Sequence, residues 1–375
     1  MPKQKDDVFA IGSPAITFSK PNQKWRIEKT VTVSSDVDAV FSEYVGSTLV
    51  NKGHIQTLGG DGVLFVENEA EVVNKATGLI AGDNGVRFTG TDNVEALLVN
   101  DGQIVGTNVG VWDLGRGDFR AENHGQIFGT NVGLEANASG AGSTSGPVIH
   151  NYGSIESEAT GVNVAAAPGL RCKIVNHEGA VIKGSTLSSG IGDGAVHNAM
   201  GDMILINKGK IKGDIFSATS GKDTITNTGK IKGTVLLGSG NDTLDNRDGK
   251  ITGYITGEDG KDKLIAGDAK EKFFFAIPAD GTNIDRVKKF ESGKDKFIFA
   301  EGVFGDLTDG PLAKSAFRRG TEAEDDDDRI IYDKDSGKLY IDDDGVGGNP
   351  HFQFAKVDPG QTLKYSDFTV ELFAA

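Results

Sequence analysis

The sequence is poor in the residues that build a thick globular core. Of its 375 residues, 7% are aromatic, one is cysteine and two are tryptophan. The single Cys172 excludes an intramolecular disulfide, and we interpret it as a small buried residue rather than a catalytic thiol. No apolar run reaches the length of a membrane-spanning helix, and the charged residues 1–7 lack the apolar centre of a cleavable export signal. We therefore expect neither a membrane span nor a cleaved leader.

Charge and missing motifs exclude further classes of function. A net charge of −15 argues against a nucleic-acid partner but is compatible with bound divalent cations. No His-Glu-x-x-His motif is present, so the zinc proteases that use it are excluded. The six histidines are scattered, and we expect His124 and His177, which follow turn asparagines, to be solvated rather than metal ligands.

Glycine is abundant, at 53 residues, and much of it belongs to a short repeat. The phrase Asn-x-Gly-Lys-Ile-x-Gly, in one copy with an extra residue, begins at Asn207, Asn227 and Asn246. Between its copies stands a second phrase, Gly-x-Asp-x-Ile/Leu, whose aspartates are Asp223, Asp242 and Asp262. A repeat this short cannot bury an apolar face until several copies stack on one another, so the pattern predicts a solenoid.

The apolar residues of each copy are β-branched or leucine and are bounded by Gly, Asn and Asp, which is typical of short strands and turns. Each copy is therefore predicted to form one coil of a right-handed parallel β-helix, with coils about 4.8 Å apart. Stacking would place Ile211, Ile231 and Ile251 in an inward ladder and Lys210, Lys230 and Lys250 outward. The repeated asparagines would form a ladder of hydrogen-bonded amides at a turn.

The same asparagine phrase occurs earlier, at wider and less regular spacing. Its starts are Asn51, Asn74, Asn100, Asn123, Asn151 and Asn176. We expect a loose lead-in over residues 1–24, capping strands over 25–41, and a degenerate aspartate phrase at Gly192-Asp193-Gly194. The acidic run 322–328 is interpreted as a solvated loop. The predicted organisation is a lead-in and cap (1–50), irregular β-helix coils (51–206), regular coils (207–269) and an aromatic-rich C-terminal cap (270–375).

From residue 221 onward the chain resembles the repeats-in-toxin (RTX) or haemolysin-type calcium-binding proteins. Their nonapeptide Gly-Gly-x-Gly-x-Asp-x-U-x, with U a large apolar residue, is matched from its second glycine by Gly238-Ser-Gly-Asn-Asp-Thr-Leu-Asp245. The region after the repeats, including Asp285-Arg-Val-Lys-Lys-Phe and the tail Asp367-Phe-Thr-Val, is similar to the segment that follows the β-roll in serralysin-type secreted proteins. The earlier coils resemble bacterial surface and autotransporter β-helices only generically.

The resemblance implies a calcium-binding β-roll, export through a type I secretion machinery by a C-terminal signal, and folding on calcium outside the cell. Calcium favours carboxylate and carbonyl oxygens, which a Gly-x-Asp turn supplies. The implied ligands are Gly221, Asp223, Gly238, Gly240, Asp242, Asp259, Gly260 and Asp262. The alternative is that these are tight Asx turns without an ion. The turns Asp333/Asp335 and Asp342/Asp344 are further candidates.

We expect a secreted or cell-surface protein that serves as a surface, matrix or interaction module. Besides calcium ions, its expected partners are a surface or matrix polysaccharide or further copies of the chain. The alternative is a carbohydrate-active β-helix enzyme of the polysaccharide lyase or epimerase type. The best candidate cluster for that alternative is Trp112, Asp113, Arg116, Asp118 and Arg120, which an exposed loop with ion pairs would equally explain.

Overall fold

A computed structural model describes residues 1–67, 69–90, 95–115, 118–139, 143–186, 194–277, 280–303 and 307–372. It divides into two compact units, unit 1 (Met1–Gly221) and unit 2 (Lys222–Ala375). Gly192 and Asp193 of the expected degenerate phrase lie outside the described residues.

The structure is all-β, and the two units together contain about 12 turns of parallel β-solenoid. Within the described residues the only helical segment is one 3-10 turn, η2 (Tyr365–Asp367). The predicted fold class, a parallel β-solenoid, is therefore confirmed, while the hand of the coil stays a prediction. No described helix has the length and apolar character needed to cross a membrane.

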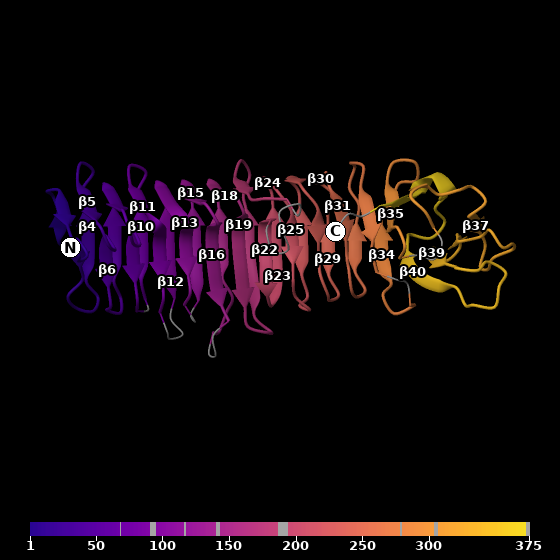
Figure 1. Cartoon of the computed structure of the whole chain (residues 1–375), viewed down its shortest axis with the longest axis horizontal. Helices are drawn as coiled ribbons and strands as arrows, with labels where there is room; N and C mark the ends of the chain where they lie inside the picture. The colour runs from indigo at the N-terminus through magenta and orange to yellow at the C-terminus, as the bar shows by residue number, and fades with distance from the viewer. Residues whose placement is uncertain are drawn as a thin grey trace. The chain divides into compact units, whose positions relative to one another are not determined.

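Unit 1 is built from coils that each add a strand to three parallel columns (Figure 1). The first column contains β1 (Lys3–Gln4), β4 (Lys24–Ile27), β7 (Thr48–Asn51), β10 (Glu71–Asn74), β12 (Ala96–Asn100), β14 (Phe119–Asn123), β17 (Val148–Asn151), β20 (Arg171–Asn176) and β23 (Asp202–Asn207). The second contains β2 (Val8–Ala10), β5 (Thr32–Ser35), β8 (His54–Thr57), β15 (Gln126–Gly129), β18 (Ser154–Ser157), β21 (Val181–Lys183) and β24 (Lys210–Lys212). The third contains β3 (Ile16–Thr17), β6 (Val40–Ser42), β9 (Val63–Phe65), β16 (Val132–Ala138), β19 (Thr160–Ala166), β22 (Gly194–Met200) and β25 (Ile215–Ser217). Two long strands, β11 (Leu79–Phe88) and β13 (Gln103–Asp113), contribute to both the second and third columns.

The alternation of apolar and polar residues sets which side chains enter the core of each coil. In the second column, from the third coil of unit 1 onward, one isoleucine per coil is completely buried, and these residues pair in register. They are Ile55, Ile80, Ile104, Ile127, Ile155, Ile182 and Ile211. The lysines beside Ile211, Ile231 and Ile251 are exposed or half-buried, so the predicted inward and outward ladders are confirmed.

The repeated asparagines end the first-column strands and are fully buried. Asn51 Nδ2 donates to Asn74 Oδ1 at 2.9 Å, and Asn74 Nδ2 donates to Asn100 Oδ1 at 2.9 Å. The same bond repeats from coil to coil as far as Asn207. Each amide also donates to a backbone carbonyl of the turn, so the buried N–H groups of the ladder are paired within the protein. The predicted asparagine ladder is confirmed.

The first residues differ from the expected loose lead-in. β1, β2 and β3 pair in parallel with β4, β5 and β6, and therefore form a complete coil. The strands expected to cap the solenoid are its second coil. The strands of this coil are only two or three residues long, so their apolar residues, such as Val8 and Ile16, show too little periodicity for the coil to be predicted. Stacking on the second coil orders them.

Unit 2 begins with regular coils and ends in a cap. Its first column is β26 (Thr224–Asn227), β29 (Thr243–Asp245), β32 (Lys263–Ile265) and β34 (Asp285–Lys288). The other columns contain β27 (Lys230–Lys232) and β30 (Lys250–Ile251), and β28 (Val235–Leu236), β31 (Tyr254–Thr256), β33 (Lys272–Phe275), β35 (Lys296–Ala300) and β41 (Phe368–Glu371). Parallel pairing thus continues past the end of the sequence repeat.

The cap of unit 2 is where antiparallel pairing appears. It contains β36 (Gly310–Pro311), β37 (Phe317–Arg319), β38 (Ile330–Asp333), β39 (Lys338–Ile341) and β40 (Phe352–Lys356). β38, β39 and β40 pair antiparallel. Phe297, Phe299 and Phe368 are fully buried here, and Phe354 packs edge-on against Phe299 at 5.3 Å. This aromatic cluster supplies the thick core that the thin coils lack.

Removing one member of the asparagine ladder tests its contribution to stability. Asn123→Ala removes one acceptor of Asn100 Nδ2 and the amide that donates to the buried Asn151 Oδ1, so we expect a loss of about 1–3 kcal/mol of unfolding free energy. Urea denaturation followed by circular dichroism measures it. Asn131→Ala, at an exposed position, is the control and should change stability by less than about 0.5 kcal/mol. Equal effects of the two substitutions would contradict a structural role of the ladder.

Candidate metal-binding sites

The aspartates of the second phrase form a column at the start of the first-column strands of unit 2. Asp223, Asp242 and Asp262 are 0–1% exposed. The backbone N–H of Asp223 donates to Asp242 Oδ1 at 2.7 Å, and that of Asp242 donates to Asp262 Oδ1 at 2.7 Å. The expectation that successive coils align these carboxylates is therefore met, and they point inward rather than into solvent.

Asp285 extends this column by one coil and was missed by the sequence reasoning. It is 4% exposed, and its Oδ1 accepts the backbone N–H of Asp262 at 3.0 Å. The signal was weak because Asp285 follows Asp262 by 23 residues and has no glycine two positions before it. Only the parallel pairing of β32 with β34 brings it into register. We call Asp223, Asp242, Asp262 and Asp285 the aspartate column.

Burial makes negative charge costly in this column. Burial and, next in size, the neighbouring Asp285 carboxylate together raise the pKa of Asp262 to about 8. Burial also raises the pKa of Asp285 to about 7, while the hydrogen bond from the Asp262 amide opposes the rise. Asp262 Oδ2 is buried and has no hydrogen-bond partner. The column therefore needs a cation or a proton among its carboxylates.

The predicted glycines shape the turns beside the column. Gly238 and Gly240 have φ values of 85° and 149°, which non-glycine residues rarely adopt. A Cβ on Gly260 would lie 1.5 Å from the Gly240 carbonyl oxygen. The backbones of the two coils are therefore in direct contact here, with no room for a side chain between them. Gly240 and Gly260 each stand two residues before an aspartate of the column. Gly221 lies at the end of unit 1, against the Gly201 carbonyl.

Asp259 is placed differently from the other predicted ligands. Its side chain is exposed, while its backbone carbonyl accepts the Gly240 N–H at 2.8 Å. Glu258, which the sequence reasoning did not select, has a positive φ of 64° and is close enough to raise the pKa of both Asp262 and Asp285. The acidic group nearest the column at this turn is therefore Glu258 rather than the Asp259 carboxylate.

The donors of the column fit a hard cation in chemistry. All of them are oxygens, from the column carboxylates and the glycine carbonyls of the neighbouring turns, as calcium prefers. Asp262 Oδ2 is a buried oxygen without a hydrogen-bond partner, which a bound cation would satisfy. The carboxylates meet in neighbouring pairs along the solenoid axis, because each coil contributes one. An ion here would therefore bridge two coils.

A second acidic pair continues the asparagine ladder of unit 2. Asn227 Nδ2 donates to Asn246 Oδ1 at 2.7 Å, and Asn246 Nδ2 donates to Glu271 Oε1 at 3.1 Å. The Glu271 backbone N–H donates to Asp295 Oδ1, and both carboxylates are almost fully buried. Burial and the neighbouring Asp295 raise the pKa of Glu271 to about 7, and burial also raises the pKa of Asp295. The pair therefore shares a proton near neutral pH.

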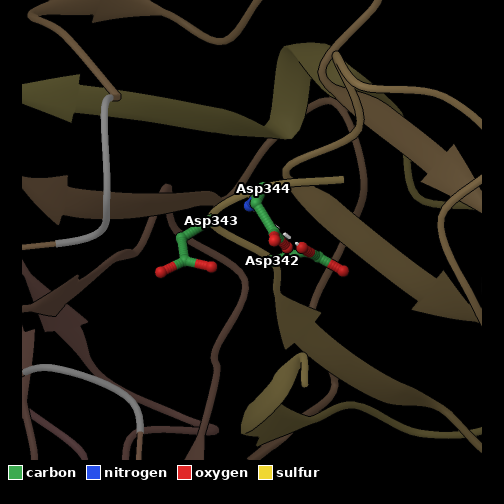
Figure 2. Close-up of side chains that lie close together, drawn as sticks. All are labelled: Asp342, Asp343 and Asp344. Atoms are coloured by element: carbon green, nitrogen blue, oxygen red, sulfur yellow. Dashed lines mark hydrogen bonds between the residues drawn. The ribbon is translucent and has the colours of Figure 1, made fainter. Parts of the chain in front are cut away.

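The cap holds the one group of three acidic side chains, within the part of the chain that the structure describes, whose ligand atoms all lie within 4.8 Å of one another. These are Asp342, Asp343 and Asp344, shown in Figure 2. Asp342 is 3% exposed, and its Oδ1 accepts the backbone N–H groups of Asp344 and Gly345. Asp344 Oδ1 is buried without a hydrogen-bond partner. Asp342 and Asp344 thus meet, as the sequence candidate required.

The acidic run expected to be solvated packs against this cluster. Asp328 is 4% exposed and accepts the Glu324 N–H at 2.8 Å, while the Asp325 carbonyl accepts the Val346 N–H at 3.2 Å. The reading of the whole run 322–328 as solvated is thus wrong for Asp328. The Asp333 turn has the same Asx pattern as Asp342, since its Oδ1 accepts the N–H groups of Asp335 and Ser336. It differs in that its Oδ2 also accepts the Ser336 hydroxyl group.

The structure disperses the candidate enzyme cluster. Trp112 is half-buried on one face of β13, with the Arg87 guanidinium 4.7 Å from its ring centroid, while Asp113 is buried on the opposite face. Burial raises the pKa of Asp113 to about 7. Asp118 accepts the Ser145 N–H, and Arg120 pairs with Glu95. Arg116 lies outside the described residues. Where it is described, the cluster does not converge on one point.

The chain matches no family model, no curated protein and no solved structure.

The close contact between Gly260 and Gly240 predicts a sharp steric effect. Gly260→Ala places a methyl group against the Gly240 carbonyl oxygen. We expect the unfolding free energy of unit 2 to fall by more than about 2 kcal/mol and its melting temperature to fall with it. Gly348→Ala, where nothing lies within 4 Å, is the matched control. Differential scanning calorimetry compares them. Two unchanged melting curves would show that these coils do not approach as described.

The Glu271 pair predicts a pH dependence of stability. The pKa of Glu271 is about 7 in the folded state against an ordinary value of 4.5, so the folded state binds more protons between these values. The contribution of Glu271 to the unfolding free energy is fully present below about pH 4.5 and is lost as the pH rises through about 7. We expect this loss to be at least ~1 kcal/mol.

Thermal unfolding in chelator at a series of pH values measures this loss. Glu271→Gln, which cannot ionise, should make the loss of stability between about pH 5 and 7.5 less steep, while Asp262 and Asp285 account for the loss that remains. Glu322→Gln, at an exposed position, should leave it unchanged. A wild-type profile that rises with pH across this range would reverse the sign and refute the interpretation.

Proposed function

We propose that this chain is a secreted calcium-binding β-solenoid of the RTX type, whose unit 2 folds when calcium binds and which serves outside the cell as a surface, matrix or interaction module. The observation that carries the proposal is the buried aspartate column, with Asp262 Oδ2 lacking a hydrogen-bond partner. A column of inward carboxylates is expensive unless something offsets its charge.

The residues that would hold calcium are the aspartate column and the turn carbonyls of Gly238, Gly240 and Gly260. When bound, calcium supplies positive charge and takes several oxygen ligands at once. The protein contributes the stacking that brings one carboxylate from each coil to its neighbour. It also holds Oδ1 of Asp242, Asp262 and Asp285 by backbone N–H groups, so the carboxylates have fixed orientations. The Asp342–Asp344 cluster is a second candidate calcium site of the same donor chemistry.

Calcium linkage suits export through a type I machinery, which the RTX resemblance implies. At low calcium the charged column opposes stacking, so the regular coils would stay unfolded. At roughly millimolar extracellular calcium, ion binding would offset the repulsion and drive folding. The place of action is then outside the cell. The partner expected there is a polysaccharide or another copy of the chain.

Calcium titration of the full chain tests the proposal. Circular dichroism should show much more β-structure in millimolar calcium than in chelator. Thermal unfolding should show a much higher melting temperature in calcium. Magnesium, which keeps its waters and demands octahedral geometry, should have much less effect. Identical spectra in chelator and in calcium would refute calcium-driven folding.

A neutralising substitution separates a calcium ion from a proton as the offsetting charge. Asp242→Asn keeps an oxygen that accepts the Asp223 N–H but removes one negative charge. If calcium is the partner, isothermal titration calorimetry should show at least about tenfold weaker binding, together with greater stability in chelator. Asp248→Asn, at an exposed position, should change neither. Unaltered calcium affinity of the Asp242 variant would exclude the column as the site.

A further inference from the structure

A cluster of aromatic and imidazole rings lies on three consecutive coils of unit 1, those of β14, β17 and β20. His124, Tyr152 and His177 each follow a ladder asparagine and stack on one another. The ring centroids of His124 and Tyr152 are 4.5 Å apart, with planes 3° apart, and those of Tyr152 and His177 are 3.8 Å and 12° apart. Tyr152 remains 43% exposed. The stack therefore holds His177 in place at the protein surface.

A second histidine meets this stack from the neighbouring strand. His150, near the end of β17, places its Nδ1 3.1 Å from His177 Nε2. A contact of this length between neutral rings joins one N–H to one lone pair. Two ligands bound to one metal ion at 2.0–2.1 Å, with angles of 90–109°, stand roughly 2.9–3.4 Å apart. The observed separation is thus the spacing of two nitrogens on a single ion.

The rings are prepared to act as ligands because they favour the neutral form. Burial lowers the pKa of His150, as do Lys173 and Arg120, while Glu122 opposes them. Burial, His150, Lys208 and His124 lower the pKa of His177. The nearby cations Lys173, Arg120 and Lys208 repel any ion that is bound only by electrostatic attraction, so binding here depends on the bonds from the imidazole nitrogens. Arg120 is itself paired with Glu95, and Glu122 is the register partner of His150.

We propose that His150 and His177 form a surface site for a divalent transition metal, of the class represented by Cu²⁺, Ni²⁺ and Zn²⁺. The ion binds Nδ1 of His150 and Nε2 of His177 from one side of the line that joins them, and its two bonds replace the hydrogen bond between the rings. The donor ring shifts to its other tautomer, so no net proton is released. Imidazole nitrogen suits these metals, whereas calcium and magnesium prefer oxygen.

The site revises the expectation that His177 is merely solvated. The sequence shows His150 and His177 27 residues apart, and their meeting depends on the in-register pairing of β17 with β20. Solvent or an exposed carboxylate such as Glu122 would complete the coordination. Two protein nitrogens with open positions describe an accessible binding site rather than a closed structural one.

Titration of the full-length chain, without an affinity tag and in excess calcium, with Cu²⁺ tests the site. Calorimetry should show binding that His150→Gln and His177→Gln each weaken by at least about tenfold. His54→Gln, at an exposed histidine in another coil, should bind as the wild type does. Binding that survives both substitutions at full strength would overturn the proposal.

Electron paramagnetic resonance of the wild-type Cu²⁺ complex gives an independent reading that needs no variant. Hyperfine coupling to two imidazole nitrogens is expected, and coupling to none or one would overturn the assignment. Far-UV circular dichroism confirms that each variant is folded before it is compared. The aspartate column lies in unit 2 and the histidines in unit 1, so failure of calcium binding and failure of this site are distinguishable.

Discussion

The structure depends on buried side chains that hydrogen-bond from one coil to the next. In a thin solenoid the backbone strands satisfy their neighbours, but the turns bring polar backbone groups inside, where no water reaches them. The asparagine ladder meets this need, because each amide donates to the next amide and to a turn carbonyl. Its cost is small, since asparagine carries no charge. The apolar ladder of isoleucines can then remain narrow.

The aspartate column uses the same coil-to-coil arrangement with a charged group. Its Oδ1 atoms accept backbone N–H groups as a neutral acceptor would, but each carboxylate adds a negative charge in a buried row. The raised pKa of Asp262 and Asp285 expresses that cost as tighter proton binding. A proton and a divalent cation are therefore competitors for the same row. The relation between stability, pH and calcium follows from which of them is present.

The repeat allowed much of this architecture to be predicted. Residues that recur at fixed spacing, such as Asn227 and Asn246 or Asp242 and Asp262, must occupy equivalent places if the copies stack, so ladders follow from periodicity. Asp285 and Glu271 escaped prediction because they join the columns through strand pairing, outside the repeat. The packing of Asp328 and the contact of His150 with His177 escaped for the same reason. Each joins residues that no local pattern relates.

The asparagine ladder of unit 2 has a direction. Asn227 donates toward Asn246, and Asn246 donates toward Glu271, whose ionised carboxylate can only accept. The last amide of such a row has an N–H group with no further amide to accept it, and an acid in the next coil accepts that N–H group. The replacement of amide by acid thus acts as a chemical terminator for the row. Coils duplicated during evolution would be accommodated before Glu271, but a coil beyond it would need a new donor, because an ionised carboxylate has none to offer.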